Sequence, residues 1–314
     1  MGNKQGILAR KKSKDKIFLI QTCDEHEGSV NCMDVSEDGS VLATGSDDKI
    51  IRLWSAKTEI VECIGRLEGH EDYITSVTIL DNYLISTSAD KTIRKWLLSA
   101  CECLIVFYGH ESTVNRITYS SDYIFSISYD KKVKCWDFDS GECVKTFKGH
   151  KNNINSIIFI SGERDAAGNV IAHKISDKRR LANKKSKLPS LRGMTNNRYR
   201  DENEEDELKD NESKDIIITG SLDSLAKSWS VGTGKCIHTF SGHTGPVTCI
   251  TSDLRKEILF TGSSDHSIRS WDIASGQLLR VFSGHHTTVL SLTVYYFHLY
   301  IDFLIGKINF SFQG

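Results

Sequence analysis

Histidine, serine, aspartate and tryptophan recur together along this chain, and the first three are the residue types of a hydrolytic triad. A serine stands eight residues before each of the five tryptophans, and an aspartate stands six residues before it. A histidine precedes each aspartate, about twenty residues upstream in every set except the fourth. Histidine oriented by aspartate can activate a serine hydroxyl for acyl transfer. Because the set occurs five times and a catalytic site is normally built once, we interpret it as structural.

Each set has one histidine, one serine, one aspartate and one tryptophan. The four best-defined sets are His70, Ser88, Asp90 and Trp96; His110, Ser128, Asp130 and Trp136; His150, Ser221, Asp223 and Trp229; and His243, Ser263, Asp265 and Trp271. A looser first set consists of His26, Ser46, Asp48 and Trp54.

The spacing of the histidines predicts a repeat architecture. His70, His110 and His150 are 40 residues apart, whereas His243 follows His150 by 93 residues. Self-similarity at about forty residues is typical of repeat proteins. Short alternating apolar runs broken by turn residues predict four strands in each repeat. A four-stranded sheet cannot bury both faces alone, so stacking the sheets around an axis, as in a β-propeller, is the expected solution.

The order Gly-His, strand, Ser-x-Asp, strand, Trp resembles the WD-repeat propeller family over residues 17–294. The Trp-Asp dipeptide itself occurs only at Trp136-Asp137 and Trp271-Asp272. The resemblance implies an all-β propeller with five clear blades and a partial or degenerate sixth, and the sequence leaves open whether the ring closes. It also implies that the histidine, aspartate, serine and tryptophan of each blade form one hydrogen-bonded chain.

Segments outside the repeat pattern divide the chain further. The repeats fall near residues 24–56, 68–98, 108–138, 148–231, 241–273 and 283–294. Residues 1–16 are predicted to form a basic flexible tail. Residues 163–214, basic early and acidic late, are predicted to form a disordered insertion within the fourth repeat. Residues 295–314 form an atypical C-terminal segment, either improvised strands of a sixth blade or an aberrant ending, and Asp302 disfavours a membrane span there.

The N-terminal residues bear on closure and on membrane contact. Ile17–Cys23 is a spare strand in the right phase to pair with the last sheet. Membrane association is expected only if Gly2 is myristoylated, since the lysines that follow would supply a second, polybasic signal.

The resemblance implies that partners meet one face of the ring around the channel mouth. That face is reached three and five residues after each motif histidine and one residue before each turn aspartate. The candidate partner-binding residues at these positions are Tyr73, Tyr129, Asn31, Thr75, Asn115, Asn153, Asn155, Thr248, Asp47 and Leu222. Tyr73 and Tyr129 are the expected anchors, because aromatic residues with a polar tip are enriched in hot spots. The alternative is that these side chains only face channel water.

The composition limits the function classes. A net charge of −1 disfavours nonspecific nucleic-acid binding. The pair Cys101-Glu-Cys103 lacks the spacing of a zinc site, so we predict no metal and no cofactor. We predict a monomeric, noncatalytic scaffold or adaptor for protein or peptide partners. The alternatives are a substrate receptor of a ubiquitin ligase and, more remotely, an enzyme with its site in the channel.

Nine cysteines, an odd number without a signal peptide, indicate a reducing compartment. We therefore expect a cytoplasmic protein. The basic run Lys178–Lys187 leaves the nucleus open as a second location.

Overall fold

The structure is a computed structural model that describes residues 21–57, 60–162, 214–295, 298–303 and 306–311. Throughout these ranges all regular secondary structure is β-strand. The predicted tail (1–16) and nearly all of the predicted insertion lie outside the described residues, as does most of the spare strand at Ile17–Cys23.

Five antiparallel sheets have four strands each, and we number them blades 1 to 5 in chain order. Blade 1 contains β1 (Val30–Val35), β2 (Val41–Ser46), β3 (Ile51–Ser55) and β4 (Glu62–Leu67). Blade 2 contains β5 (Ile74–Leu80), β6 (Tyr83–Ser88), β7 (Ile93–Leu97) and β8 (Glu102–Phe107). Blade 3 contains β9 (Val114–Tyr119), β10 (Tyr123–Ser128), β11 (Lys132–Asp137) and β12 (Cys143–Lys148). Blade 4 contains β13 (Ile154–Ile160), β14 (Ile216–Ser221), β15 (Ala226–Ser230) and β16 (Cys236–Phe240). Blade 5 contains β17 (Val247–Ser252), β18 (Ile258–Ser263), β19 (Ile268–Asp272) and β20 (Leu278–Phe282).

The turn aspartates explain where the second strand of each blade ends. Asp90 caps its own turn, because its Oδ1 accepts the backbone N–H of Thr92 at 2.8 Å. The residue between them, Lys91, has a φ of 73°, in the left-handed region that a tight turn requires. Blades 1, 3, 4 and 5 repeat this arrangement.

The core lies between successive blades. Ile85, Ile93 and Phe107 of blade 2 pack against Val114 and Trp136 of blade 3, and all five side chains are buried. Comparable clusters join the other neighbouring blades. Each blade therefore obtains its hydrophobic stabilisation from its neighbours, as expected for a repeat fold.

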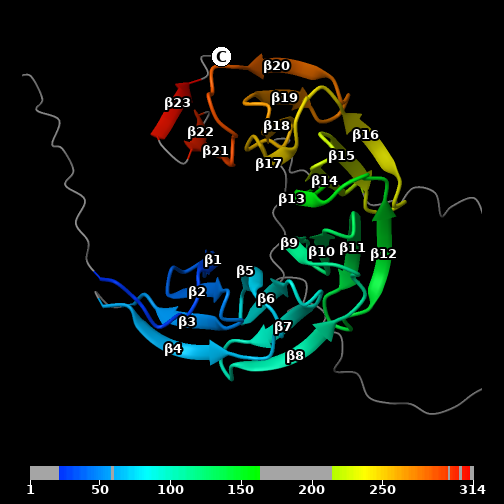
Figure 1. Ribbon diagram of the computed structural model, residues 1–314. Helices are drawn as coiled ribbons and strands as arrows, with labels where there is room; N and C mark the ends of the chain where they lie inside the picture. Colours follow the sequence, from blue (N-terminus) through cyan, green and yellow to red (C-terminus); the bar gives the residue numbers. More distant parts are fainter. Residues whose placement is uncertain (1–20, 58–59, 163–213, 296–297, 304–305, 312–314) are drawn as a thin grey trace, which may run out of the picture.

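A sixth sheet follows and is incomplete. It contains three strands, β21 (Ser291–Tyr295), β22 (His298–Phe303) and β23 (Gly306–Ser311). The prediction of a degenerate sixth blade is thus confirmed. Figure 1 shows the sheets arranged around an axis with an open side between β1 of blade 1 and β21–β23. The ring is not closed.

Candidate functional site

Blade 3 shows how the recurring polar residues are connected. The Nδ1 atom of His110 lies 2.7 Å from Oδ2 of Asp130, and its Nε2 atom lies 2.7 Å from Oγ of Ser126. The indole Nε1 of Trp136 donates to the same Oγ at 2.8 Å. Since an indole can only donate, the Ser126 hydroxyl gives its proton to His110 Nε2, and His110 Nδ1 donates to the carboxylate. The four side chains form one directed chain of hydrogen bonds.

The hydroxyl in this chain is not the one that the sequence analysis expected. In every blade the bridge between histidine and tryptophan is a serine or threonine ten residues before the tryptophan. These bridging residues are Thr44, Ser86, Ser126, Thr219 and Thr261. The assignment of the bridge to the serine eight residues before the tryptophan was wrong.

The register of the sheet gives the physical reason. Trp136 pairs with Ile124 across β10 and β11, so Ser126 is its diagonal neighbour, within reach of a long ring. Ser128 lies beyond the last pair of that ladder, at the turn. A hydroxyl residue ten positions before all five tryptophans was the sequence signal that was missed.

The serines eight residues before each tryptophan stabilise the turn instead. Ser128 Oγ accepts the backbone N–H of Asp130 at 3.1 Å and donates to the carbonyl of Ser112 at 3.0 Å. The equivalent serines of blades 2, 4 and 5, namely Ser88, Ser221 and Ser263, make the same two kinds of contact. They tie the turn to the loop that enters the blade.

Burial sets the charge state of the set. It lowers the pKa of His70, His150 and His243, although the neighbouring aspartates act in the opposite direction. Burial alone would raise the pKa of Asp90, but hydrogen bonds from His70 and Thr92 outweigh it and leave the pKa lowered. A neutral histidine beside an ionised aspartate is therefore the resting state of the sets in blades 2, 4 and 5.

These sets cannot act as nucleophiles. Ser86 and Ser126 are fully buried, and each hydroxyl already bonds to both histidine and tryptophan. No substrate carbonyl can reach an oxygen in that position.

On the predicted partner face, the positions three residues after each motif histidine lie beside those one residue before each turn aspartate. We call these the outer rim positions. In all five blades, the residue before the turn aspartate donates its backbone N–H to the backbone carbonyl of the residue three positions after the motif histidine, at 2.9–3.0 Å. The pairs are Asp47 with Ser29, Ala89 with Tyr73, Tyr129 with Thr113, Leu222 with Asn153, and Ser264 with Pro246. Tyr73 and Tyr129 are 38% and 37% exposed, whereas Asn153 and Leu222 are half-buried.

The positions five residues after each motif histidine, which we call the inner rim positions, mostly point toward the next blade. Asn31 donates to the carbonyl of Ile74 at 3.0 Å, and Thr75 donates to that of Val114 at 2.5 Å. Asn115 and Thr248 donate in the same way to Ile154 and Val289. The carbonyl of half-buried Asn155 also accepts from Asn115, at 3.3 Å. These donors join blades, so less of their hydrogen-bonding capacity faces a partner than the sequence suggested.

Comparison with known families decides the identity of the fold. The family model for the WD domain, G-beta repeat, matches residues 18–55, 61–96, 101–137, 141–167 and 234–272, more than half of the chain. The chain belongs to the WD-repeat family. Its WD repeats indicate a protein-interaction scaffold.

Individual relatives match shorter regions. The chain is 40% identical to human WD repeat-containing protein 86 over 62 residues, which cover 20% of the chain and 16% of that protein. It is 31% identical to mitochondrial division protein 1 of Schizosaccharomyces pombe over 80 residues, which cover 26% and 12% of the two chains. Nuclear distribution protein PAC1-2 of Uncinocarpus reesii is 43% identical over 60 residues, 18% of the chain and 12% of that protein. Each match thus spans less than a fifth of the relative.

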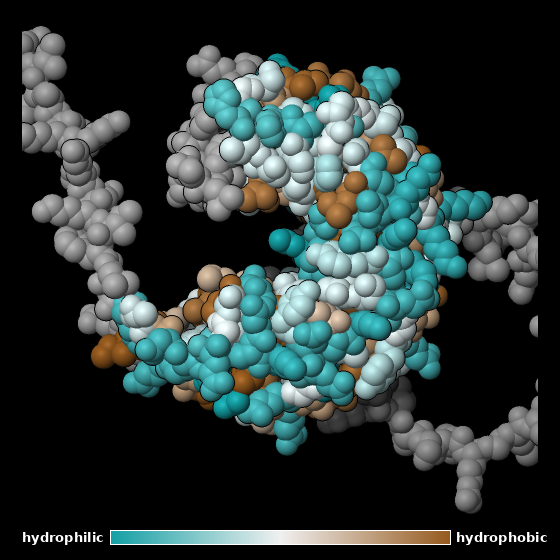
Figure 2. Space-filling model, viewed as in Figure 1, coloured by the Kyte–Doolittle hydropathy of each residue, from teal (hydrophilic) through white to brown (hydrophobic). Residues whose placement is uncertain are grey.

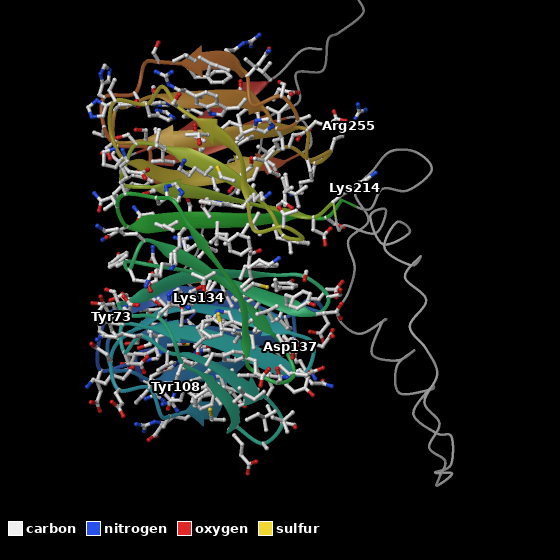
Figure 3. The ribbon with its side chains drawn as sticks, turned by 90° about the vertical axis from the view of Figure 1, so that its right-hand side faces the viewer. Tyr73, Tyr108, Lys134, Asp137, Lys214 and Arg255 are labelled. Carbon is white, nitrogen blue, oxygen red and sulfur yellow. The ribbon has the colours of Figure 1, made fainter. Side chains whose placement is uncertain are left out.

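A third tyrosine of this WD-repeat protein was missed by the sequence analysis. Tyr108 is 72% exposed and directly precedes the Gly-His of blade 3, where other repeats carry Glu68, Lys148 or Ser241. Figure 3 shows Tyr73 at one end of the sheets, and Asp137, Lys214 and Arg255 toward the other. The aromatic residue in a position that is otherwise polar was the available signal.

The opposite end of the WD repeats carries a hollow of about 550 Å³ between blades 4 and 5, lined by Lys214, His238, Lys256 and Asp272 among others. Burial lowers the pKa of Lys256 there. Within the described residues, no group of three or more histidine, cysteine or acidic side chains is placed to bind a metal ion. A search of the same part of the chain finds no helix long and apolar enough to cross a membrane.

Proposed function

We propose that this WD-repeat protein is a noncatalytic adaptor that holds a protein or peptide segment across blades 2 and 3, on the predicted partner face that carries Tyr73 and Tyr129. The observation that carries the proposal is the exposure of Tyr73 and Tyr129 on adjacent blades of that face. Two partly exposed tyrosines offer large contact area with a polar tip, as hot-spot residues do.

The backbone beneath both tyrosines is held in place. Tyr73 donates its N–H to Oδ1 of Asp72 at 2.8 Å, and its carbonyl accepts from Ala89 at 3.0 Å. Tyr129 donates its N–H to the carbonyl of Thr113 at 3.0 Å. Anchors on an ordered backbone lose less conformational entropy on binding than anchors on a free loop.

Charge on this face is mixed and does not select a partner by sign. Exposed Glu71 and Lys91 stand on blade 2, and exposed Glu111 and Lys131 stand on blade 3. Recognition therefore depends on the two tyrosines more than on net charge.

The proposal extends to the setting of the protein. All nine cysteines are free thiols, which fits a reducing compartment and a cytoplasmic adaptor. We propose that the adaptor acts as a monomer.

Affinity purification with mass spectrometry tests the proposal. We expect the Tyr73→Ala/Tyr129→Ala double variant to lose a set of partners that the unchanged chain retains. Tyr119→Ala is the matched control, because Tyr119 is 39% exposed at the far end of β9 and should keep those partners. Identical partner sets for the double variant and the unchanged chain would contradict the proposal.

A further inference from the structure

The start of the described chain is fastened to the outer edge of blade 1. Gln21 Nε2 donates to the backbone carbonyl of Val61 at 2.7 Å, and Gln21 Oε1 accepts the backbone N–H of Val61 at 2.8 Å. Val61 directly precedes β4, the outermost strand of that blade. Figure 1 shows the dark-blue start of the described chain beside the loop that joins β3 to β4. We call residues 21–25 the N-terminal arm.

Arg52 of β3 holds the other end of the arm. Its Nη2 donates to the backbone carbonyl of Glu25 at 2.5 Å, and its Nη1 lies 3.9 Å from Sγ of Cys63 on β4. One guanidinium group therefore contacts both the arm and the outer strand. With Gln21 bonded at one end and Glu25 at the other, the arm is held against blade 1 at two points.

A pair of cysteines lies between these two points. Cys23 is two residues from both Gln21 and Glu25, and Cys63 is two residues after Val61. Both thiols are exposed, and Figure 2 shows this corner of blade 1 at the surface of the described chain. Because the chain is attached on both sides of Cys23, its thiol stays close to β4 and meets Cys63 at a high effective concentration.

The two thiols differ in their electrostatic surroundings. Cys63 has the guanidinium group of Arg52 beside its sulfur, and a neighbouring cation is typical of reactive cysteines. Partial desolvation, the carboxylates of Glu25 and Asp24, and the nearby Cys63 together raise the pKa of Cys23. Cys63 is therefore suited to attack an oxidant first, and Cys23 is suited to react second.

Other cysteines of the chain are placed differently. Burial raises the pKa of Cys32 and Cys135 to about 12 and that of Cys249 to about 11. Buried thiols of this kind are inert. Cys143 and Cys236 are exposed on the outer strands of blades 3 and 4, whereas the arm with its second thiol lies on blade 1. The position of the arm therefore selects the pair that reacts.

We propose that Cys23 and Cys63 form a reversible disulfide in response to hydrogen peroxide, and that this bond locks the N-terminal arm onto blade 1. The Cys63 thiolate attacks one peroxide oxygen, so that an S–O bond forms and the O–O bond breaks. The second oxygen leaves as hydroxide, which takes up the proton that Cys63 released. Cys63 is then a sulfenic acid.

The second step closes the lock. The sulfur of Cys23 attacks the sulfur of Cys63, and the hydroxyl group of the sulfenic acid leaves with the Cys23 proton as water. In sum, two thiols are oxidised to one disulfide, and one hydrogen peroxide is reduced to two waters. Two molecules of a small thiol such as glutathione reverse the reaction by exchange and become a disulfide themselves. The lock uses neither Tyr73 nor Tyr129, so it can operate whether or not the adaptor proposal holds.

Peptide mapping of the full chain tests for this disulfide. The reduced, dilute protein is treated with hydrogen peroxide, its remaining thiols are alkylated, and it is digested after glutamate without reduction. Cleavage after Glu25 and Glu27 separates Cys23 from Cys32. We expect one major cross-link, between Cys23 and Cys63, which disappears after treatment with reduced glutathione.

Single variants separate the roles of the residues. In Cys23→Ser, Cys63 has no thiol to react with, so we expect a sulfenic acid on Cys63 that a cyclic diketone labels. Gln21→Ala frees one end of the arm and should slow cross-linking roughly fivefold, because the effective concentration of Cys23 at Cys63 falls. Gln21 and Cys23 are exposed, so both reduced variants should keep the melting temperature of the unchanged chain.

Cys236→Ser is the matched control. Cys236 is exposed and pairs with the tryptophan of its blade, as Cys63 does, so its loss should leave the rate of cross-linking unchanged.

Other outcomes contradict the proposal. One is a peroxide-treated chain in which Cys23 and Cys63 are alkylated or oxidised separately. Another is a cross-link between two chains, seen as a dimer on a nonreducing gel, because the thiol that reacts with Cys63 would then belong to another copy. Equal rates for Gln21→Ala and the unchanged chain would show that the arm does not position Cys23.

Discussion

A single hydroxyl group decides whether the polar set of each blade is satisfied. Ser126 receives the indole N–H of Trp136 and supplies a proton to His110, and all three side chains are buried. Removing that oxygen leaves a donor and an acceptor without partners inside the protein. The set thus behaves as one unit, and its weakest point is the shared oxygen.

We therefore expect Ser126→Ala to lower the free energy of unfolding by about 2 kcal/mol, the usual cost of stranding buried polar groups. Ser126→Thr is the matched control, because threonine fills this place in blades 1, 4 and 5, as Thr44, Thr219 and Thr261. Thermal denaturation followed by circular dichroism measures both. Equal melting temperatures for the alanine variant and the unchanged chain would show that the bridge does not stabilise the blade.

At the scale of the element, blade 4 forms although residues 161–215 separate its first two strands, β13 and β14. β13 and β14 pair along their length, from Ile154 with Ser221 to Ile160 with Ile216. Gly162 donates its N–H to Oδ1 of Asp215 at 2.8 Å, and it lies directly beside Lys214. The insertion therefore leaves and re-enters the sheet at one point.

Deleting residues 163–213 should leave the melting temperature within about 2 °C of the unchanged chain, because loop length contributes little to stability. The sheet pairing does not depend on the deleted residues. Differential scanning calorimetry of the deletion variant checks this expectation. A fall of ten degrees or more would mean that the insertion contacts the blades.

At the scale of the whole molecule, the polar sets of successive blades give stability a common pH dependence. Burial lowers the pKa of three motif histidines, His70, His150 and His243. Five turn aspartates also have lowered pKa values, because hydrogen bonds outweigh their burial. For both residue types the unfolded chain takes up protons first as the pH falls, so acid favours unfolding.

Stability should change little between pH 8 and pH 7 and should decline as the pH falls below about 6.5, the unfolded value for histidine, and again below about 4, that for aspartate. Melting temperatures measured from pH 8 to pH 3.5 test this. A melting temperature that rises as the pH is lowered from 6.5 to 5 would mean that the histidines are charged in the folded blades.

The repeat pattern was sufficient to predict the architecture. Tryptophans in one phase and strand-length runs such as Tyr83–Ser88 are local signals, and β6 spans those same residues. The degenerate sixth blade was also predictable, since apolar alternation survives there without the motif. Hydrogen-bond partners were less predictable, because Ser126 and Ser128 are both serines near a tryptophan and only the strand register separates them.

By itself the sequence determined the fold class, the five clear blades and the residues that recur in each, because strand alternation and turn chemistry are local properties. Only the tertiary structure decided that Ser126 and not Ser128 bridges His110 and Trp136, and that inner donors such as Asn31 join neighbouring blades. The tertiary structure also decided that Val30 is exposed while Ile74 is buried. The two residues are equivalent in sequence, and their difference arises from whether another blade stands beside them.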